Sequence, residues 1–233
     1  MKNVKQMKKV LFVALMAWMA IGTASAQQDW ANYRKYEQSN REIKAQSNNG
    51  RRVIFFGNSI TENWGRNRRE FFTENDYICR GIGGQTSYQL LLRFREDVIA
   101  LKPKVVVLNG CTNDIAENNH PYVEDRTVGN VASMCEIAKA NGVKVILTTV
   151  TPCDHYGWKP DIKDVPQKIQ HLNERLREYA QQHKILFVDY WTPMADERGH
   201  MQKGLTDDGC HPTNAGYAIM EPLIKKAIKK YVK

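Results

Sequence analysis

Five short apolar segments, each followed by glycine or polar residues, constrain the fold of this chain more than any other feature. The segment at 104–108 is almost continuously apolar, which is typical of a strand that helices cover on both faces. Strand-like and helix-like segments alternate five times, so the sequence predicts a three-layer α/β/α domain with a five-stranded parallel sheet and right-handed crossovers. The predicted strands lie at 53–56, 77–80, 104–108, 144–150 and 185–188.

The chain of 233 residues is long enough for one well-buried domain, which we place at 27–233. An amphipathic helix is predicted at 29–48, where Trp30, Tyr33 and Tyr36 are spaced by three. Further helices are predicted at 62–72, from 86 or 87 to 100, at 122–140, at 167–183 and after Pro212, with a loop at 152–166 and irregular chain at 189–210.

The first 26 residues have the pattern of a secretory signal peptide. Lysines precede an apolar run at 10–21, and Ala24-Ser25-Ala26 offers small residues for cleavage. The apolar run is short for a bilayer span, and no cysteine follows the cleavage site to carry a lipid. The sequence therefore predicts a periplasmic or secreted protein without a stable membrane anchor.

The charge distribution argues against a nucleic-acid partner. Of the formal charge of +9, four lysines lie in residues 1–26, which contain no acidic residue, and this leaves +5 for the remainder. A lysine-rich terminal helix, which is typically a solvated face, accounts for that remainder. Its lysines are Lys225, Lys226, Lys229, Lys230 and Lys233.

Five cysteines are an odd number for a chain that is predicted to be exported. Cys111, Cys153 and Cys210 are expected at strand ends on one side, so a disulfide between two of them is one hypothesis. A zinc site at Cys153-Asp-His155 and Cys210-His211 is a weaker alternative, because no paired Cys-x-x-Cys spacing supports it. We predict neither a metal nor a cofactor.

Ser59 follows the first predicted strand and the glycine that ends it, Gly57. In open α/β sheets ligands bind beyond the carboxyl ends of the strands, so this serine stands where a nucleophile is expected. Asn58, Ser59 and Thr61 are also residue types that form turns and cap helices. The serine alone therefore establishes no function.

The segment at 207–212 supplies the base that a serine nucleophile needs. A serine hydroxyl reacts once a base takes its proton, and histidine does so near neutral pH when a carboxylate fixes its tautomer. With Asp208 three residues before His211, one turn places the carboxylate against Nδ1 and leaves Nε2 free for Ser59. The alternative is a surface turn with an incidental histidine.

Three hydrogen-bond donors for an oxyanion follow three different strands. They are the amides of Ser59 and Gly84 and the side-chain NH2 of Asn113. Glycine at position 84 lets the backbone approach a ligand closely. Taken separately, 81–84 is a plain turn and Asn113 a helix cap. Together with Ser59 and His211 at one sheet edge, they predict an acyl-transfer site.

Four blocks of the sequence resemble those of the SGNH/GDSL hydrolases, in the family's order: Gly57-Asn-Ser-Ile-Thr61, Arg80-Gly-Ile-Gly-Gly-Gln-Thr86, Thr112-Asn-Asp114 and Asp208-Gly-Cys-His211. The resemblance is closest to the branch with lysophospholipase/thioesterase I, platelet-activating-factor acetylhydrolase catalytic subunits and carbohydrate acetylesterases. It implies a flavodoxin-like five-stranded sheet and an ester hydrolase that needs no metal. It further implies that Ser59 is the nucleophile, His211 the base and Asp208 its partner, with Gly84 and Asn113 as oxyanion donors.

Two positions depart from the family's pattern. Asn58 stands where the family has aspartate, and Cys111 where it has the glycine before Thr-Asn-Asp. At position 58 an amide replaces the carboxylate that braces the surrounding loops in the family, so we expect a change in the rigidity of those loops. The second change puts a side chain near the expected oxyanion region, where it would narrow the acyl pocket or bridge to Cys153. Asn58 and Cys111 join four residues of the expected rim as candidate substrate-binding residues. The full set is Asn58, Asn63, Trp64, Cys111, Tyr156 and Trp158.

These features predict an exported serine esterase that forms an acyl-enzyme and removes O-acetyl groups from a carbohydrate. Tyr156 and Trp158 would stack on a sugar ring, with Asn63 and Trp64 on the opposite rim; alternatively, the aromatic side chains close a small core under the loop at 152–166. Two other functions stay open: a lysophospholipase or thioesterase that acts on longer acyl chains, and a glycan-binding module without turnover.

Overall fold

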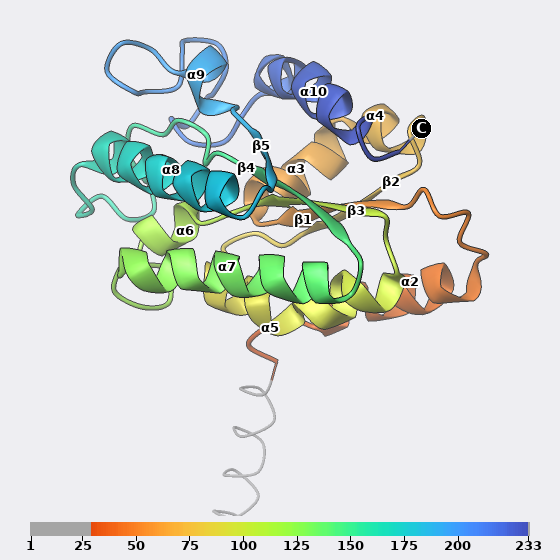
Figure 1. The fold of residues 1–233 in the computed structure, drawn as a ribbon. Coiled ribbons are helices and arrows are strands. Elements are labelled where there is room, and N and C mark those ends of the chain that lie inside the picture. The colour runs from red at the N-terminus through yellow and green to blue at the C-terminus, as the bar shows by residue number, and fades with distance from the viewer. Residues whose placement is uncertain (1–28, 233) are drawn as a thin grey trace, which may run out of the picture.

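A five-stranded parallel sheet lies between two layers of helices in the computed structural model, which describes residues 29–232 (Figure 1). The spatial order is β2-β1-β3-β4-β5, and each neighbouring pair is parallel. This order confirms the predicted flavodoxin-like three-layer α/β/α fold. The strands are β1 (Val53–Gly57), β2 (Tyr77–Gly81), β3 (Val105–Asn109), β4 (Lys144–Thr148) and β5 (Leu186–Val188).

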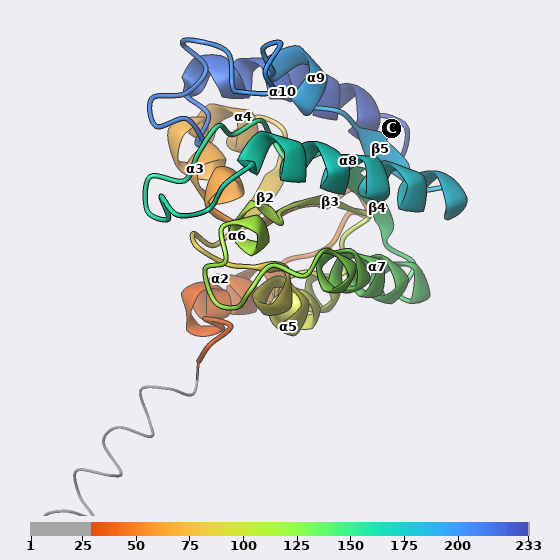
Figure 2. The same ribbon diagram turned by 90° about the vertical axis from the view of Figure 1, so that its left-hand side faces the viewer.

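The helices form one layer on each side of the sheet (Figures 1 and 2). One layer contains α2 (Arg34–Ala45), α5 (Ser87–Asp97) and α7 (Glu124–Ala140), and the other contains α3 (Ser59–Asn67), α4 (Arg69–Thr73) and α10 (Asn214–Ile228). The helix between β4 and β5 is α8 (Val165–Gln182), and it contacts α7. Shorter turns of helix are η1 (Ile99–Leu101), α6 (Thr112–Ile115) and α9 (Trp191–Met194).

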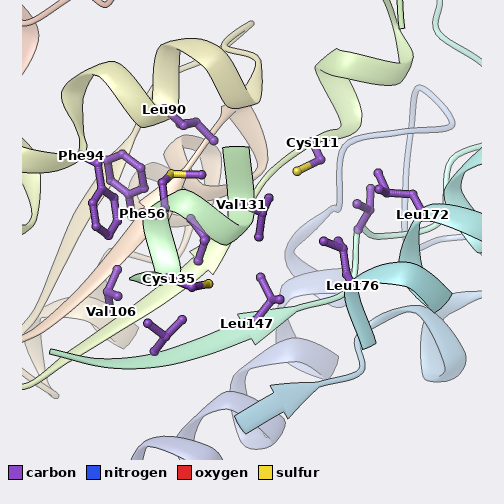
Figure 3. Packing of buried hydrophobic residues seen from close by; sticks show 14 of the residues in the cluster. Phe56, Leu90, Phe94, Val106, Cys111, Val131, Cys135, Leu147, Leu172 and Leu176 are labelled. Atoms are coloured by element: carbon purple, nitrogen blue, oxygen red, sulfur yellow. The ribbon is translucent and has the colours of Figure 1, made fainter. Parts of the chain in front are cut away.

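The strands are apolar throughout because their alternate side chains enter two different hydrophobic clusters. Ile54 and Phe56 of β1 pack with residues of α5, α7 and α8. Val53 and Phe55 of the same strand pack with residues of α3, α4 and α10. Figure 3 shows the first cluster: Phe56 lies near Leu90 and Phe94 at one end, Leu172 and Leu176 lie at the other, and Val131 and Cys135 lie between them.

Helix boundaries differ from the predicted ones where a side chain or a turn overrides the apolar pattern. The helix predicted at 62–72 begins earlier, at Ser59, and a non-helical residue, Arg68, divides it into α3 and α4. The helix predicted at 29–48 is shorter, because Gln46 leaves the helical conformation and becomes extended (ψ 147°) directly after Ala45. The short helices α6 and α9 were not predicted.

The predicted signal peptide, residues 1–26, lies outside the described residues. Among residues 29–232, no helix combines the length and the apolar composition that a membrane span needs.

Glycines at the ends of β1 and β2 allow α3 to lie directly against the edge of the sheet. Gly57 stands opposite Gly81 on one side and Asn109 on the other. A Cβ atom at Gly57 would lie 2.0 Å from the Asn109 oxygen, and one at Gly81 would lie 2.2 Å from the Glu62 nitrogen. The chain therefore leaves β1 between β2 and β3, at the point where the strand order reverses and ligands bind in such sheets.

We expect Gly57→Ala to lower the free energy of unfolding by at least about 1–3 kcal/mol, because the added methyl group overlaps backbone atoms. Gly129→Ala is the matched control. A Cβ atom there, within α7, meets no atom within 4 Å, so the better helix former should stabilise the protein by up to about 1 kcal/mol. Urea-induced unfolding measures both changes. Equal stability of the Gly57→Ala variant and the wild type would contradict the close approach of the Asn109 backbone to Gly57.

Candidate active site

The structure brings together the three residues that the sequence predicted as a catalytic triad. Ser59 is the first residue of α3, and its Oγ lies 2.9 Å from Nε2 of His211, 152 residues later in the chain. Nδ1 of the same ring lies 2.6 Å from Oδ2 of Asp208. A carboxylate only accepts, so Nδ1 carries the proton of the neutral ring and Nε2 accepts from the serine hydroxyl.

Asp208 is held by backbone amides as well as by the ring of His211. Its Oδ1 accepts from the amides of Cys210, at 2.9 Å, and His211, at 2.7 Å. Burial alone would raise the pKa of the Asp208 carboxyl, but these hydrogen bonds and the bond to the ring lower it to about 2. At pH values above 3.8, the ordinary pKa of aspartate, the ionised carboxylate therefore stabilises the folded state. This stabilisation is lost as the pH falls through about 2.

The loop that follows β4 lies against this turn. The amide of Asp154 donates to the carbonyl of Gly209 at 3.2 Å. Gly209 itself has a φ of 81°, and a Cβ atom there would lie 2.0 Å from an oxygen of the Asp154 side chain. A glycine is therefore needed between Asp208 and His211 for both conformation and space.

The three predicted oxyanion donors lie on the segments that follow β1, β2 and β3. The amide of Ser59 belongs to the first turn of α3, where amides have no acceptor within the helix. Gly84 has a φ of 74°, which favours glycine. Asn113 is 1% exposed, and its Nδ2 donates to the carbonyl of Gln85 at 3.0 Å. An amide NH2 has two hydrogens, so one stays available for a ligand.

Two buried or half-buried carboxylates hold these donors and were not predicted. Oε2 of Glu62 accepts from the amide of Gly83 at 2.6 Å, which fixes the peptide before Gly84. Asp114, which follows Asn113 in α6, is fully buried and accepts from the amide of Ser87 at 2.8 Å and from its hydroxyl at 2.5 Å. These contacts tie α3 and α6 to the chain that follows β2.

Residues 55–219 match the GDSL-like lipase/acylhydrolase family. The chain belongs to this family. The match spans all four sequence blocks that resembled the SGNH/GDSL hydrolases, and so confirms that resemblance.

A solved structure agrees with this assignment, and two curated proteins are similar to parts of the chain. A crystal structure of a GDSL-like lipase from Bacteroides thetaiotaomicron is 54% identical, covers 87% of this chain and 99% of that chain, and superposes with a TM-score of 0.85. An acetylxylan esterase of Xylanibacter ruminicola is 24% identical over an alignment 225 residues long, which covers 81% of this chain and 45% of the esterase. The uncharacterized lipoprotein YqeF of Bacillus subtilis is 36% identical over 80 residues, 33% of each chain. This chain of the GDSL family thus spans between one third and less than one half of the length of these two curated relatives.

Trp158 is the predicted substrate-binding residue that the structure places beside the triad with an exposed face. It is 43% exposed, and its ring centroid lies 5.7 Å from that of His211. Its Nε1 donates to Oδ1 of Asn118 at 2.9 Å, while Nδ2 of Asn118 donates to the carbonyl of Gly84 at 3.0 Å. Asn118 therefore links Trp158 to Gly84, one of the predicted oxyanion donors. It was not predicted, because its polar neighbours in the sequence are typical of a plain turn.

Two other aromatic residues were wrongly predicted to face the substrate. Trp64 is 2% exposed and stacks with Phe71 and Tyr217 in the core between α3, α4 and α10. Tyr156 is fully buried, and its hydroxyl lies 3.0 Å from that of Thr112. Tyr156 instead supports Trp158 from behind, with ring centroids 5.1 Å apart.

The two departures from the family's pattern are buried as well, so neither is placed to contact substrate. Asn58 is fully buried, and its Oδ1 caps α3 by accepting from the amide of Ile60 at 3.1 Å. Cys111 is 3% exposed and packs in the hydrophobic cluster of Figure 3 rather than narrowing an acyl pocket. Its φ of 77° explains why glycine is the usual residue at this position.

A groove lies beside His211. It has a volume of about 760 Å³ and includes Asn63, the one predicted residue of this rim that is not buried in the core. The groove is lined by Asn63, Asn67, Asp207, Asp208, His211, Pro212, Thr213, Asn214 and Ala215.

All five cysteines lie within the described residues and are free, so the hypothesis of a bridge among Cys111, Cys153 and Cys210 is wrong for this structure. The Cys153 thiol donates instead to the carbonyl of His155 at 3.1 Å. In residues 29–232 no group of three or more histidine, cysteine or acidic side chains is gathered to bind a metal ion.

We expect Asp208→Asn to lower kcat on the order of 10⁴-fold, because the amide no longer fixes the proton on Nδ1 of His211. Initial rates with p-nitrophenyl acetate, corrected for spontaneous hydrolysis, measure the effect. Asp161→Asn is the control, an exposed aspartate in the loop after β4, and should stay within about twofold of wild type. A fully active Asp208→Asn variant would show that the Asp208 carboxylate takes no part in the reaction.

Proposed function

We propose that this chain is a serine ester hydrolase that works through an acyl-enzyme. One observation carries the proposal: the unbroken hydrogen-bonded chain from Oγ of Ser59 through His211 to the carboxylate of Asp208. An isolated serine hydroxyl is a weak nucleophile, and a histidine fixed in this tautomer makes it reactive.

The reaction proceeds in two displacements at the ester carbonyl. Oγ of Ser59 attacks the carbonyl carbon while its proton moves to Nε2 of His211, at 2.9 Å. The tetrahedral intermediate expels the alcohol, which takes the proton from Nε2, and the acyl group stays on the serine. Water then attacks the acyl-enzyme with His211 again as base, and the carboxylic acid leaves. The ionised Asp208 stabilises the imidazolium in both steps.

The negative charge on the carbonyl oxygen is stabilised by donors already in place. The amides of Ser59 and Gly84 and the free hydrogen of the Asn113 NH2 group supply three hydrogen bonds. Fixed donors of this kind stabilise the transition state without reorganisation, and one donor is typically worth about 10²–10³ in turnover.

The substrate is an O-acetylated carbohydrate. The exposed ring of Trp158 lies next to His211 and is fixed by Asn118, so it offers a flat apolar surface to a sugar ring. The polar groove with Asn63 on the other side of His211 suits the hydroxyl groups of the leaving alcohol. The likeness to an acetylxylan esterase supports the same substrate class.

The protein acts outside the cytoplasm, in the periplasm or after secretion. The lysines, the apolar run and the small residues of the first 26 positions support export. The alignment with a lipoprotein of Bacillus subtilis supports it too.

An acetate-release assay on acetylated xylo-oligosaccharides tests the substrate. We expect Ser59→Ala to lose turnover, and Trp158→Leu to raise KM about tenfold, since one stacking contact is worth about 1.4 kcal/mol at most. Trp30→Leu is the matched control, because Trp30 is equally exposed, at 48%, and lies on the N-terminal segment. With p-nitrophenyl esters, acetate should be hydrolysed faster than octanoate.

Each alternative function has its own outcome in the same assay. A strong preference for octanoate, with no release of acetate from glycans, would favour a lysophospholipase or thioesterase. Binding of the oligosaccharide without turnover would favour a glycan-binding module. Turnover that survives Ser59→Ala would refute the serine mechanism.

A further inference from the structure

A buried arginine behind the active site bonds to the segments that carry the oxyanion donors. Arg93, in α5, is fully buried and lies over the ring of Phe56, with its guanidinium carbon 4.3 Å from the ring centroid. It forms an ion pair with Asp97, one turn later, at 2.8 Å. Taking both charges out of water is costly, and the fold offsets this cost only where the geometry and further hydrogen bonds are good.

The remaining donors of the guanidinium group reach three different parts of the chain. Nη2 donates to the carbonyl of Gly57 at 2.8 Å, and Nη1 donates to the carbonyl of Arg80 at 3.0 Å. These carbonyls lie at the ends of β1 and β2. Nε donates to Oε1 of Gln85 at 2.6 Å. Four acceptors thus use a planar fork that lysine cannot reproduce.

Two of these contacts lie one or two residues from a predicted oxyanion donor. Gly57 is two residues before Ser59, and Gln85 directly follows Gly84. The backbone carbonyl of Gln85 also accepts from Nδ2 of Asn113 at 3.0 Å. Arg93 therefore bonds directly to the segments that supply two of the donors and is linked through Gln85 to the third.

The cluster is anchored to the N-terminal part of the domain. Nδ2 of Asn40, in α2, donates to Oδ1 of Asp97 at 2.6 Å, and Nε2 of Gln85 donates to the carbonyl of Ala31 at 2.8 Å. Both polar partners of Arg93 are buried, with Asp97 1% and Gln85 2% exposed. Their positions are therefore fixed by the protein rather than by solvent.

We propose that Arg93 is a positioning residue of the active site, which holds the segments after β1 and β2 so that Ser59, Gly84 and Asn113 point at one oxyanion. This inference rests on the proposed serine mechanism. Because Arg93 is buried behind the sheet edge, it acts through Gly57 and Gln85 and does not contact substrate.

Arg93→Lys tests the proposal, because lysine keeps the charge but concentrates its donors on one nitrogen. We expect kcat for p-nitrophenyl acetate to fall about 10- to 100-fold per folded molecule, with KM within about twofold, since small misplacements of catalytic groups cost this much. Affinity for an alkyl boronic acid, which forms a tetrahedral adduct with serine, should fall in parallel. A merely structural role would lower only the thermal midpoint.

Arg95→Lys is the matched control, because Arg95 lies on the same helix and is exposed. Gln85→Met serves as a second variant that keeps the ion pair of Arg93 and Asp97, and it should lower kcat about three- to tenfold. A folded Arg93→Lys or Gln85→Met variant with kcat within twofold of Arg95→Lys would overturn the proposal. Ser59→Ala separates the two levels. If Ser59→Ala is inactive while kcat of Arg93→Lys is unchanged, the positioning role of Arg93 is refuted and the serine mechanism stands. If Ser59→Ala is active, the serine mechanism itself is refuted.

Discussion

The parallel alignment of β1, β2 and β3 is the constraint on which the rest of this structure depends. Because the three strands end level, at Gly57, Gly81 and Asn109, the chain leaves the sheet three times at one edge. Glycine at the first two ends lets α3 return across that edge without a Cβ clash. Backbone topology therefore gathers the candidate donors and the candidate nucleophile, and only the proposed base and its carboxylate come from elsewhere, the turn before α10.

The parts of the site that depend on short spacings were predictable from the sequence. A buried strand that ends in glycine places the next residues at the sheet edge, as for Ser59. Asp208 and His211 need only one turn between them to form their hydrogen bond. The fold was predictable for a related reason: strands that are buried on both faces have no polar alternation, and the crossover rule for parallel strands leaves few topologies.

The parts that depend on long-range packing were not predictable. Trp64 and Trp158 are both aromatic residues near predicted site positions, yet one is core and the other half exposed. Residues of α4 and α10 enclose Trp64, whereas Tyr156 and His211 cover only part of Trp158. Asn118 and Glu62 meet their partners across 34 and 21 residues, for which no local pattern exists.

Arg93 shows where a finer use of periodicity would have helped. In the run Arg93-Phe-Arg-Glu-Asp97 the charged residues suggest a solvated helix face. The helical period nevertheless places Arg93 and Asp97 with Leu90 and Phe94, all of which are buried. Polar residues on the apolar stripe of a helix are therefore candidates for a buried, hydrogen-bonded role rather than for the surface.

Covalent labelling tests the central claim, that the hydroxyl of Ser59 is activated by His211, most directly. A fluorophosphonate probe reacts with a serine that has such a base, and peptide mass spectrometry locates the adduct. The account predicts a single adduct on Ser59 in the wild type and none in a folded His211→Ala variant. An adduct on another residue, or undiminished labelling of Ser59 in the absence of the imidazole, would contradict it.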